Sequence, residues 1–318
     1  MPLTGPYVVV DDFLPADLAA AMRGDIDRHF SEPGAHRPES HQVWNYWFVP
    51  ELYAYLRTTP EKIIERPLVD RFFATLTAWS AENTGMLGVS WPYLSLYVPG
   101  CRQGMHNDSR NGRFGFVYSL TRDARRTTGG ETILHREGDH FRAKLAQASA
   151  GSGFFECVEP RFNRLLVFDD RLPHAVERID GVMDPVEGRF VLHGHLSEAG
   201  ALVTGALAAD VIGRIVVAHI RELMEAASAR LALYHGPLVL RLAIKPDGGL
   251  ARCEVVLDRV IHPDIGDAEW APWLRSLLKR LETVKFPVAT GPTRATLPLI
   301  FGGSLPGAER DVGANRSA

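Results

Sequence analysis

The chain has 318 residues, of which 46% are hydrophobic and 23% are charged, and its length predicts two domains of roughly 150 residues. Its 35 lysines and arginines nearly balance its 38 aspartates and glutamates, and the net charge of −3 excludes a general attraction to nucleic acid or to an anionic membrane. The three cysteines are too few for a disulfide framework, no stretch reaches the roughly 18 apolar residues of a membrane span, and the N-terminus shows no targeting pattern. We therefore expect a cytoplasmic protein.

The first ninety or so residues predict elements that support a sheet. Residues 7–13 are rich in β-branched side chains and predict a strand, and residues 16–30 have apolar positions at helical spacing. Residues 61–83 predict one helix, or two that are interrupted near Pro67. The aromatic run at residues 43–49 predicts core packing, with a wall of a substrate site as the alternative.

The middle third changes to short alternating runs that are separated by turns. Such runs are typical of an antiparallel sandwich or barrel, and a double-stranded β-helix, or jelly roll, accommodates their number. The candidate strands are residues 93–98, 113–120, 131–135, 164–168, 174–179 and 189–194.

After Ser197 the pattern changes again, and we place a domain boundary between residues 1–199 and 200–318. The second part begins with a helical pattern and continues with a hairpin around the turn Lys245-Pro246-Asp247-Gly248-Gly249. The predicted fold is mostly β with flanking helices, a jelly-roll catalytic domain followed by a small α+β domain. Its expected C-terminal elements are a helical segment over residues 201–233, strands at 236–244 and 250–257, a helix at 267–283, a strand at 296–301 and a frayed tail at 302–318.

The chemistry of the chain concentrates at His106-Asn107-Asp108 and at His174. In an extended segment, His106 and Asp108 point to the same side because alternate residues share a face. Two imidazoles and one carboxylate form the facial triad that holds non-haem Fe(II) and leaves positions open for other ligands. The His-x-Asp pair alone occurs by chance, but His174 follows an apolar run and begins another candidate strand.

Arg189 follows Gly188 at the start of the run Arg-Phe-Val-Leu-His-Gly. A guanidinium inside a barrel needs an anionic partner, because an unpaired buried charge is very costly. A dicarboxylate co-substrate would supply that partner through a bidentate contact.

Together these residues resemble the Fe(II)- and 2-oxoglutarate-dependent oxygenases, in particular the prolyl 4-hydroxylase-like branch. The same resemblance extends to Gly129-Gly130-Glu131-Thr132 before a strand and to the opening Val8-Val9-Val10-Asp11-Asp12-Phe13-Leu14-Pro15. The likeness covers roughly residues 7–198. It implies that His106, Asp108 and His174 bind iron and that Arg189 binds the far carboxylate of 2-oxoglutarate. Tyr97 matches, more loosely, a position whose hydroxyl reaches the same carboxylate, and a core tyrosine is an equal contender there.

One departure from the family pattern lies between His174 and Arg189. The spacing is longer than usual, with residues 180–185 as an apparent insertion, so Arg178 competes with Arg189 for the carboxylate. Of the remaining histidines, we expect His36 and His41 to be solvated and four others to be structural or to support the metal ligands. These four are His135, His140, His193 and His195.

The resemblance implies a dioxygenase that uses Fe(II), 2-oxoglutarate and O2, with ascorbate as a further candidate cofactor. Asp108 stands where halogenating relatives have a small residue, which favours hydroxylation, and desaturation stays open. The expected substrate is an amino-acid side chain in a peptide or protein. The alternatives are a free small molecule, as in natural-product tailoring, and, from another class, a non-catalytic metal-binding jelly-roll protein.

The C-terminal part resembles, more weakly, the small domain found at the C-termini of TonB-type proteins. The likeness rests on residues 240–249, on Val284-Lys285-Phe286-Pro287 and on the final strand that ends Pro298-Leu299-Ile300-Phe301. It implies protein contacts, so we expect substrate docking or a homodimer through this domain.

Overall fold

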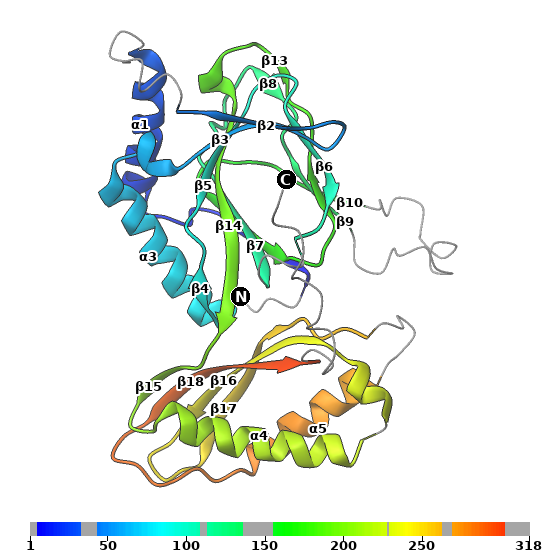
Figure 1. The fold of residues 1–318 in the computed structure, drawn as a ribbon. Helices are drawn as coiled ribbons and strands as arrows, with labels where there is room; N and C mark the ends of the chain where they lie inside the picture. The colour runs from blue at the N-terminus through cyan, green and yellow to red at the C-terminus, as the bar shows by residue number, and fades with distance from the viewer. Residues whose placement is uncertain are drawn as a thin grey trace, which may run out of the picture. The chain divides into compact units, whose positions relative to one another are not determined.

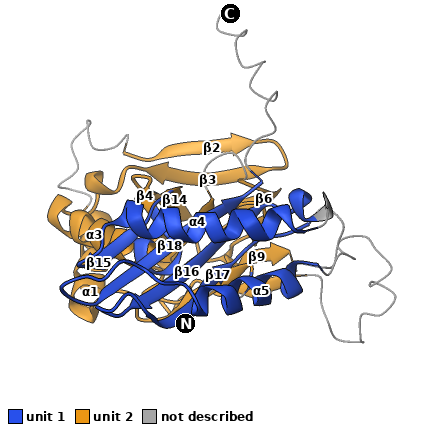
Figure 2. Ribbon diagram, turned by 90° about the horizontal axis from the view of Figure 1, so that it is seen from below, with its two compact units in different colours: residues 1–5, 81–86, 199–318 blue, residues 6–80, 87–198 orange. Residues whose placement is uncertain are grey.

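The computed structural model describes residues 5–32, 43–108, 113–135, 155–227, 229–262 and 269–302. The chain divides into two compact units (Figure 2). One unit contains residues 6–80 and 87–198, and the other contains residues 1–5, 81–86 and 199–318. None of the helices within the described ranges is both long and apolar enough to span a membrane.

The first unit is built on a curled antiparallel sheet of twelve strands (Figure 1). The strands run in the order β1-β11-β7-β14-β5-β3-β6-β12-β9-β10, with β2 paired to β3 and β4 paired to β14. The strands β8 and β13 form a separate pair. The bounds are β1 Tyr7–Val10, β2 Asn45–Val49, β3 Tyr53–Thr58, β4 Met86–Val89, β5 Tyr93–Tyr97, β6 Arg102–His106, β7 Phe114–Ser119, β8 Thr127–Thr128, β9 Thr132–His135, β10 Phe155–Val158, β11 Arg164–Asp169, β12 His174–Val176, β13 Asp180–Gly181 and β14 Arg189–Ala199.

Two helices, α1 (Ala16–Ser31) and α3 (Arg66–Asn83), cover one face of this sheet (Figure 1). Phe72 of α3 packs against Phe116 and Tyr118 of β7, with ring centroids 6.4 and 5.0 Å away. From α1, Arg23 lies 4.9 Å over the ring of Phe190 in β14. The opposite face is thereby left to line a pocket.

Pro67 does not interrupt a helix, contrary to one of the two expectations. It lies in the first turn of α3, where its missing N–H costs no hydrogen bond, and a short 3₁₀ turn, η2 (Pro60–Lys62), precedes it. The insertion between His174 and Arg189 forms β13, which pairs with β8, and a second 3₁₀ turn, η4 (Pro185–Glu187).

The second unit is a four-stranded antiparallel sheet in the order β15-β18-β16-β17, with helices α4 and α5 (Figure 1). Alternate residues of β16, including Leu238, Leu240 and Leu242, are fully buried in one apolar core with Trp273 and Leu277 of α5. The bounds are β15 Leu202–Gly205, α4 Ala209–Glu225, η5 Ala229–Leu233, β16 Gly236–Ile244, β17 Leu250–Asp258, α5 Trp270–Glu282 and β18 Thr293–Phe301.

The predicted fold class, mostly β with flanking helices and a small α+β C-terminal part, is confirmed. Two local predictions were wrong. The aromatic run at residues 45–49 is an exposed edge strand rather than core, and residues 202–205 form a strand where a helix was expected. The expected tail, apart from Gly302, lies outside the described residues.

Asn163 ties the N-terminal segment to the sheet. It is 3% exposed and has a φ of 58°, a conformation that asparagine adopts more readily than most residues. Its Oδ1 accepts hydrogen bonds from the Leu14 N–H and the Tyr118 hydroxyl, both at 2.9 Å, and its Nδ2 donates to the Leu14 carbonyl at 2.8 Å. The side chain thus provides hydrogen-bond partners for three polar groups that are buried from solvent.

We predict that Asn163→Ala lowers the free energy of unfolding by about 2–4 kcal/mol, because it removes three buried hydrogen bonds and places alanine at a positive φ. Urea denaturation followed by circular dichroism measures the change. Asn45→Ala, at an exposed position of β2, is the control and should change stability by less than about 0.5 kcal/mol. Equal losses in the two variants would contradict this role.

Candidate active site

The pairing of β6 with β12 brings the two ligand candidates together. His106 is the last residue of β6, His174 is the first residue of β12, and the antiparallel register places them opposite each other. Their rings lie 4.2 Å apart between centroids. Asp108 follows two residues after His106, and its backbone N–H donates to the Asp170 carbonyl at 2.9 Å.

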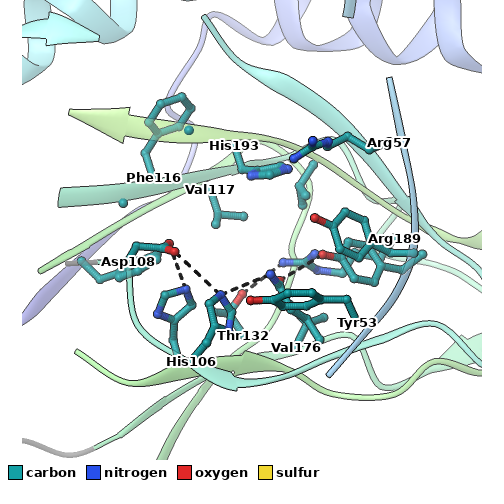
Figure 3. A pocket seen from close by; sticks show the side chains of 18 of the residues that line it. Tyr53, Arg57, His106, Asp108, Phe116, Val117, Thr132, Val176, Arg189 and His193 are labelled. Carbon is teal, nitrogen blue, oxygen red and sulfur yellow. Dashed lines mark hydrogen bonds and ion pairs between the residues drawn. The ribbon is translucent and has the colours of Figure 1, made fainter. Parts of the chain in front are cut away.

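The ligand atoms of His106, Asp108 and His174 all lie within 4.8 Å of one another. Asp108 Oδ2 is 3.3 Å from His174 Nε2, and Asp108 Oδ1 is 4.0 Å from His106 Nε2. Figure 3 shows Asp108 and His106 at the same side of the pocket. The three predicted ligands therefore converge.

The backbone sets the tautomer of both imidazoles. His106 Nδ1 is 2.8 Å from the Gly104 carbonyl, and His174 Nδ1 is 3.0 Å from the Leu172 carbonyl. Because a carbonyl only accepts, each Nδ1 must hold a proton, and each Nε2 is the ring nitrogen turned towards Asp108. This donor set fits a divalent metal ion, because two Nε2 atoms that have released any proton and one carboxylate oxygen can bind the same cation.

The electrostatics of the group agree with this reading. Burial lowers the pKa of His106, and the neighbouring His174 lowers it further, so the ring is neutral at pH 7. Burial by itself raises the pKa of Asp108, but the hydrogen bond and charge of His174, with His195 and His106, outweigh it and bring that pKa to about 2. A neutral imidazole and an ionised carboxylate are the protonation states that bind metals.

Arg189 is the largest side chain that is almost fully enclosed, at 1% exposure. One Nη donates to Thr132 Oγ1 at 3.1 Å, while its Nε has no hydrogen-bond partner. Burial lowers the pKa of the guanidinium, although arginine stays charged in proteins. The only acidic residue among the described residues that line the pocket is Asp108, in the triad. The buried charge and the orphan N–H both fit an anionic ligand.

The Gly129-Gly130 pair makes room for this arginine. Gly130 has a φ of +82°, and a Cβ there would lie 2.5 Å from Ile179 Cδ1 and 3.1 Å from Arg189 Cδ. Only glycine fits both the backbone conformation and the space. The sequence motif before β9 therefore has a packing role at the Arg189 end of the pocket.

Tyr97 lies beside Arg189, as the register between β5 and β14 requires. The Arg189 Cζ is 4.8 Å from the Tyr97 ring, and the Tyr97 hydroxyl donates to Gln103 Oε1 at 3.3 Å. Burial raises the Tyr97 pKa, so the phenol keeps its proton and can donate to an anion. Arg178, in contrast, has a side chain 54% exposed, pairs with Asp180 at 3.3 Å and does not line the pocket.

The pocket around these groups has a volume of about 270 Å³, near the lower end of small-molecule sites, which span roughly 300–1,000 Å³. Gln103 and Arg57 were not singled out from the sequence, and Thr132 was quoted only as the last residue of the motif before β9. Thr132 and Gln103 hydrogen-bond to the predicted site residues, and Arg57 of β3 lines the same pocket. The alternation of Tyr53, Tyr55 and Arg57 on one strand was the available signal. Trp47, from the aromatic run, lines the pocket as the alternative expectation had it.

The other histidines divide by position. His193 and His195 project into the pocket from alternate positions of β14, and His193 Nε2 is 2.8 Å from Ser95 Oγ. His135 does not line the pocket and packs against Phe155, with ring centroids 5.6 Å apart. His36, His41 and His140 lie outside the described residues.

Comparisons with known proteins give similarity in fold only. No family model and no curated protein sequence matches the chain. A prolyl-4-hydroxylase from Pseudomonas putida is 18% identical, with a TM-score of 0.44 over 61% of this chain and 94% of that one. A prolyl hydroxylase from Trichoplax adhaerens, in complex with a hypoxia inducible factor peptide fragment, is 15% identical, with a TM-score of 0.41 over 60% and 82% of the two chains.

AviO1 from Streptomyces viridochromogenes is 17% identical, with a TM-score of 0.41 over 61% of this chain and 90% of that one. Likenesses this distant do not assign an activity.

We predict that His174→Ala abolishes stoichiometric binding of Fe(II), because two ligands cannot replace three on one face of the metal. Anaerobic titration calorimetry measures the loss. The control is His219→Ala, on α4, which should bind the metal as the unchanged protein does. Retention of tight binding by His174→Ala would refute the triad.

Proposed function

We propose that the chain is an Fe(II)- and 2-oxoglutarate-dependent oxygenase that hydroxylates a C–H bond of a small substrate or of a polypeptide side chain. One observation supports this above all. A metal-type triad, with both Nδ1 protons committed to backbone carbonyls, shares one pocket with a buried guanidinium, and the described residues that line this pocket contain no carboxylate besides Asp108 of the triad. A structural metal site alone does not account for the arginine.

In this proposal His106, Asp108 and His174 hold the iron, and Arg189 with Thr132 and Tyr97 holds the far carboxylate of 2-oxoglutarate. When bound, the metal and co-substrate supply the oxidising chemistry, in which substrate, O2 and 2-oxoglutarate give hydroxylated substrate, succinate and carbon dioxide. The balance is complete, since one oxygen atom enters the substrate and the other enters succinate.

The protein's own residues supply geometry and exclude water. Gln103 Nε2 lies 3.2 Å from His106 Nε2, the atom that the metal needs, so Gln103 has to turn away when metal binds. Its other contact, the Tyr97 hydroxyl, is then free to donate to the carboxylate at Arg189. Gln103 thereby links occupation of the triad to readiness of the anion site.

The competing function is a non-catalytic metal-binding protein on the same fold. It predicts metal binding without any effect of 2-oxoglutarate. The likeness of residues 200–318 to the TonB C-terminal domain, and the docking or homodimer role, stay predictions.

We predict that anaerobic addition of 2-oxoglutarate to the Fe(II)-loaded protein produces a weak visible charge-transfer band. We also predict that Arg189→Gln lowers the affinity for 2-oxoglutarate at least tenfold, while its affinity for Fe(II) changes less than about twofold. Spectrophotometric titration and calorimetry measure the two affinities. Arg178→Gln, at the competing and exposed position, is the matched control and should behave as the unchanged protein.

Three outcomes count against the proposal. Absence of the band together with no succinate formed in air favours the non-catalytic protein. If Arg189→Gln loses iron binding as completely as His174→Ala does, the assigned roles are wrong. If Arg178→Gln lowers the affinity for 2-oxoglutarate and Arg189→Gln does not, Arg178 is the residue that binds the far carboxylate.

A further inference from the structure

A second guanidinium, that of Arg57, lines the same pocket and has no role in the proposed binding of iron and 2-oxoglutarate. It is on the same face of β3 as Tyr53 and Tyr55, because alternate residues of a strand share a face. Figure 3 shows Arg57 and His193 on the side of the pocket opposite His106, while Arg189 lies at another end. The pocket therefore has two separate cationic positions.

The sheet fixes the position of the Arg57 guanidinium. Strand β3 pairs with β2 on one edge and with β5 on the other, so aromatic rings reach Arg57 from both sides. Its Cζ lies 3.6 Å from the centroid of the Trp47 ring and 4.0 Å from that of the Tyr93 ring. With rings packed on it from both flanking strands, a guanidinium presents its hydrogen-bond donors along its edge.

No acidic side chain is available to meet that edge within the pocket. Asp108, in the triad, is the only carboxylate among the described residues that line it. The facing His193 does not help, because burial, with the charges of Arg57 and Arg189, lowers its pKa to about 3 and keeps it neutral. Within the described lining of the pocket, Arg57 therefore has the uncharged Tyr55 hydroxyl and His193 near it but no carboxylate to balance its charge.

We propose that Arg57 binds a carboxylate of the substrate, so that the substrate is a carboxylic acid. This inference rests on the proposed function, in which the 2-oxoglutarate carboxylate takes Arg189. A single guanidinium edge matches a single planar carboxylate in a bidentate pair. The carboxylate belongs either to a free small acid or to the C-terminus of a peptide; an internal segment of a polypeptide lacks this group.

The test uses the full chain loaded with zinc(II), which is diamagnetic, and with saturating 2-oxoglutarate, which fills the Arg189 site. Hexanoate and hydrocinnamate are the probes, each compared with its primary amide by saturation-transfer NMR. We expect the acids to bind at least tenfold more tightly than the amides. We expect Arg57→Gln to abolish this preference. Arg57→Lys should keep part of it, because lysine retains the positive charge but cannot form the bidentate pair that a guanidinium makes with a carboxylate.

Arg102→Gln is the matched control. Arg102 is an exposed residue of the neighbouring strand β6 and does not line the pocket, so its loss removes the same charge from outside the site. This variant should retain the preference for acids. Thermal unfolding of all three variants confirms that each has folded.

Several results would overturn the inference. Equal binding of acids and amides by the unchanged protein, or no acid binding at millimolar concentration, excludes a carboxylate site. A preference for acids that survives Arg57→Gln removes Arg57 from the site. Weakening of 2-oxoglutarate by Arg57→Gln as strongly as by Arg189→Gln assigns Arg57 to the co-substrate instead.

Failure of the inference is distinguishable from failure of the proposed function. The first leaves the charge-transfer band and succinate formation intact, whereas the second abolishes both. Competition against hydrocinnamate then separates the two sources of the carboxylate. Displacement by free L-amino acids alone identifies a free acid, displacement by dipeptides with a free C-terminus alone identifies a chain end, and displacement by amidated dipeptides contradicts the proposal.

Discussion

The antiparallel pairing of β6 with β12 is the constraint on which the site depends. It places His174 opposite His106 at the point where both strands meet the pocket, and the chain after β6 returns Asp108 to the same side. The backbone also sets the chemistry, since the Gly104 and Leu172 carbonyls accept the Nδ1 protons and turn each Nε2 towards the pocket. The proposed metal site therefore needs no side chain beyond the three ligands to fix the Nδ1 protons.

The second constraint is the burial of positive charge. Enclosing Arg189 at 1% exposure is costly when the described lining of its pocket offers no carboxylate besides Asp108 of the triad, and a fold optimised only for stability has no reason to keep it. Glycine at position 130 leaves room for the arginine and tolerates the positive φ, but a glycine loses more conformational entropy on folding than other residues do. The cost is understandable if a bound dianion supplies the missing charge during the working cycle.

Register across β3, β5 and β14 organises the rest of the pocket. Tyr97 lies opposite Arg189, and His193 opposite Tyr93, so the side chains of three strands meet on one face. The same register places aromatic rings on both sides of Arg57. Two arginines at different ends of one small pocket suit two different acids better than one.

Sequence alone determined the mostly β class, and it singled out the three residues of the triad and Arg189, which the structure brings into one pocket, because strand alternation and metal-ligand chemistry are local properties of the chain. It misjudged residues 45–49, since a run of aromatic residues has the same composition whether it packs inside or forms an edge strand over a pocket. Only the tertiary structure showed that Arg189 lines the pocket and that Arg178, on the other side of the insertion at residues 180–185, does not. It also placed Arg57, Thr132 and Gln103 in one pocket, because strand register joins residues that are distant along the chain, and local sequence patterns do not show which strands are neighbours.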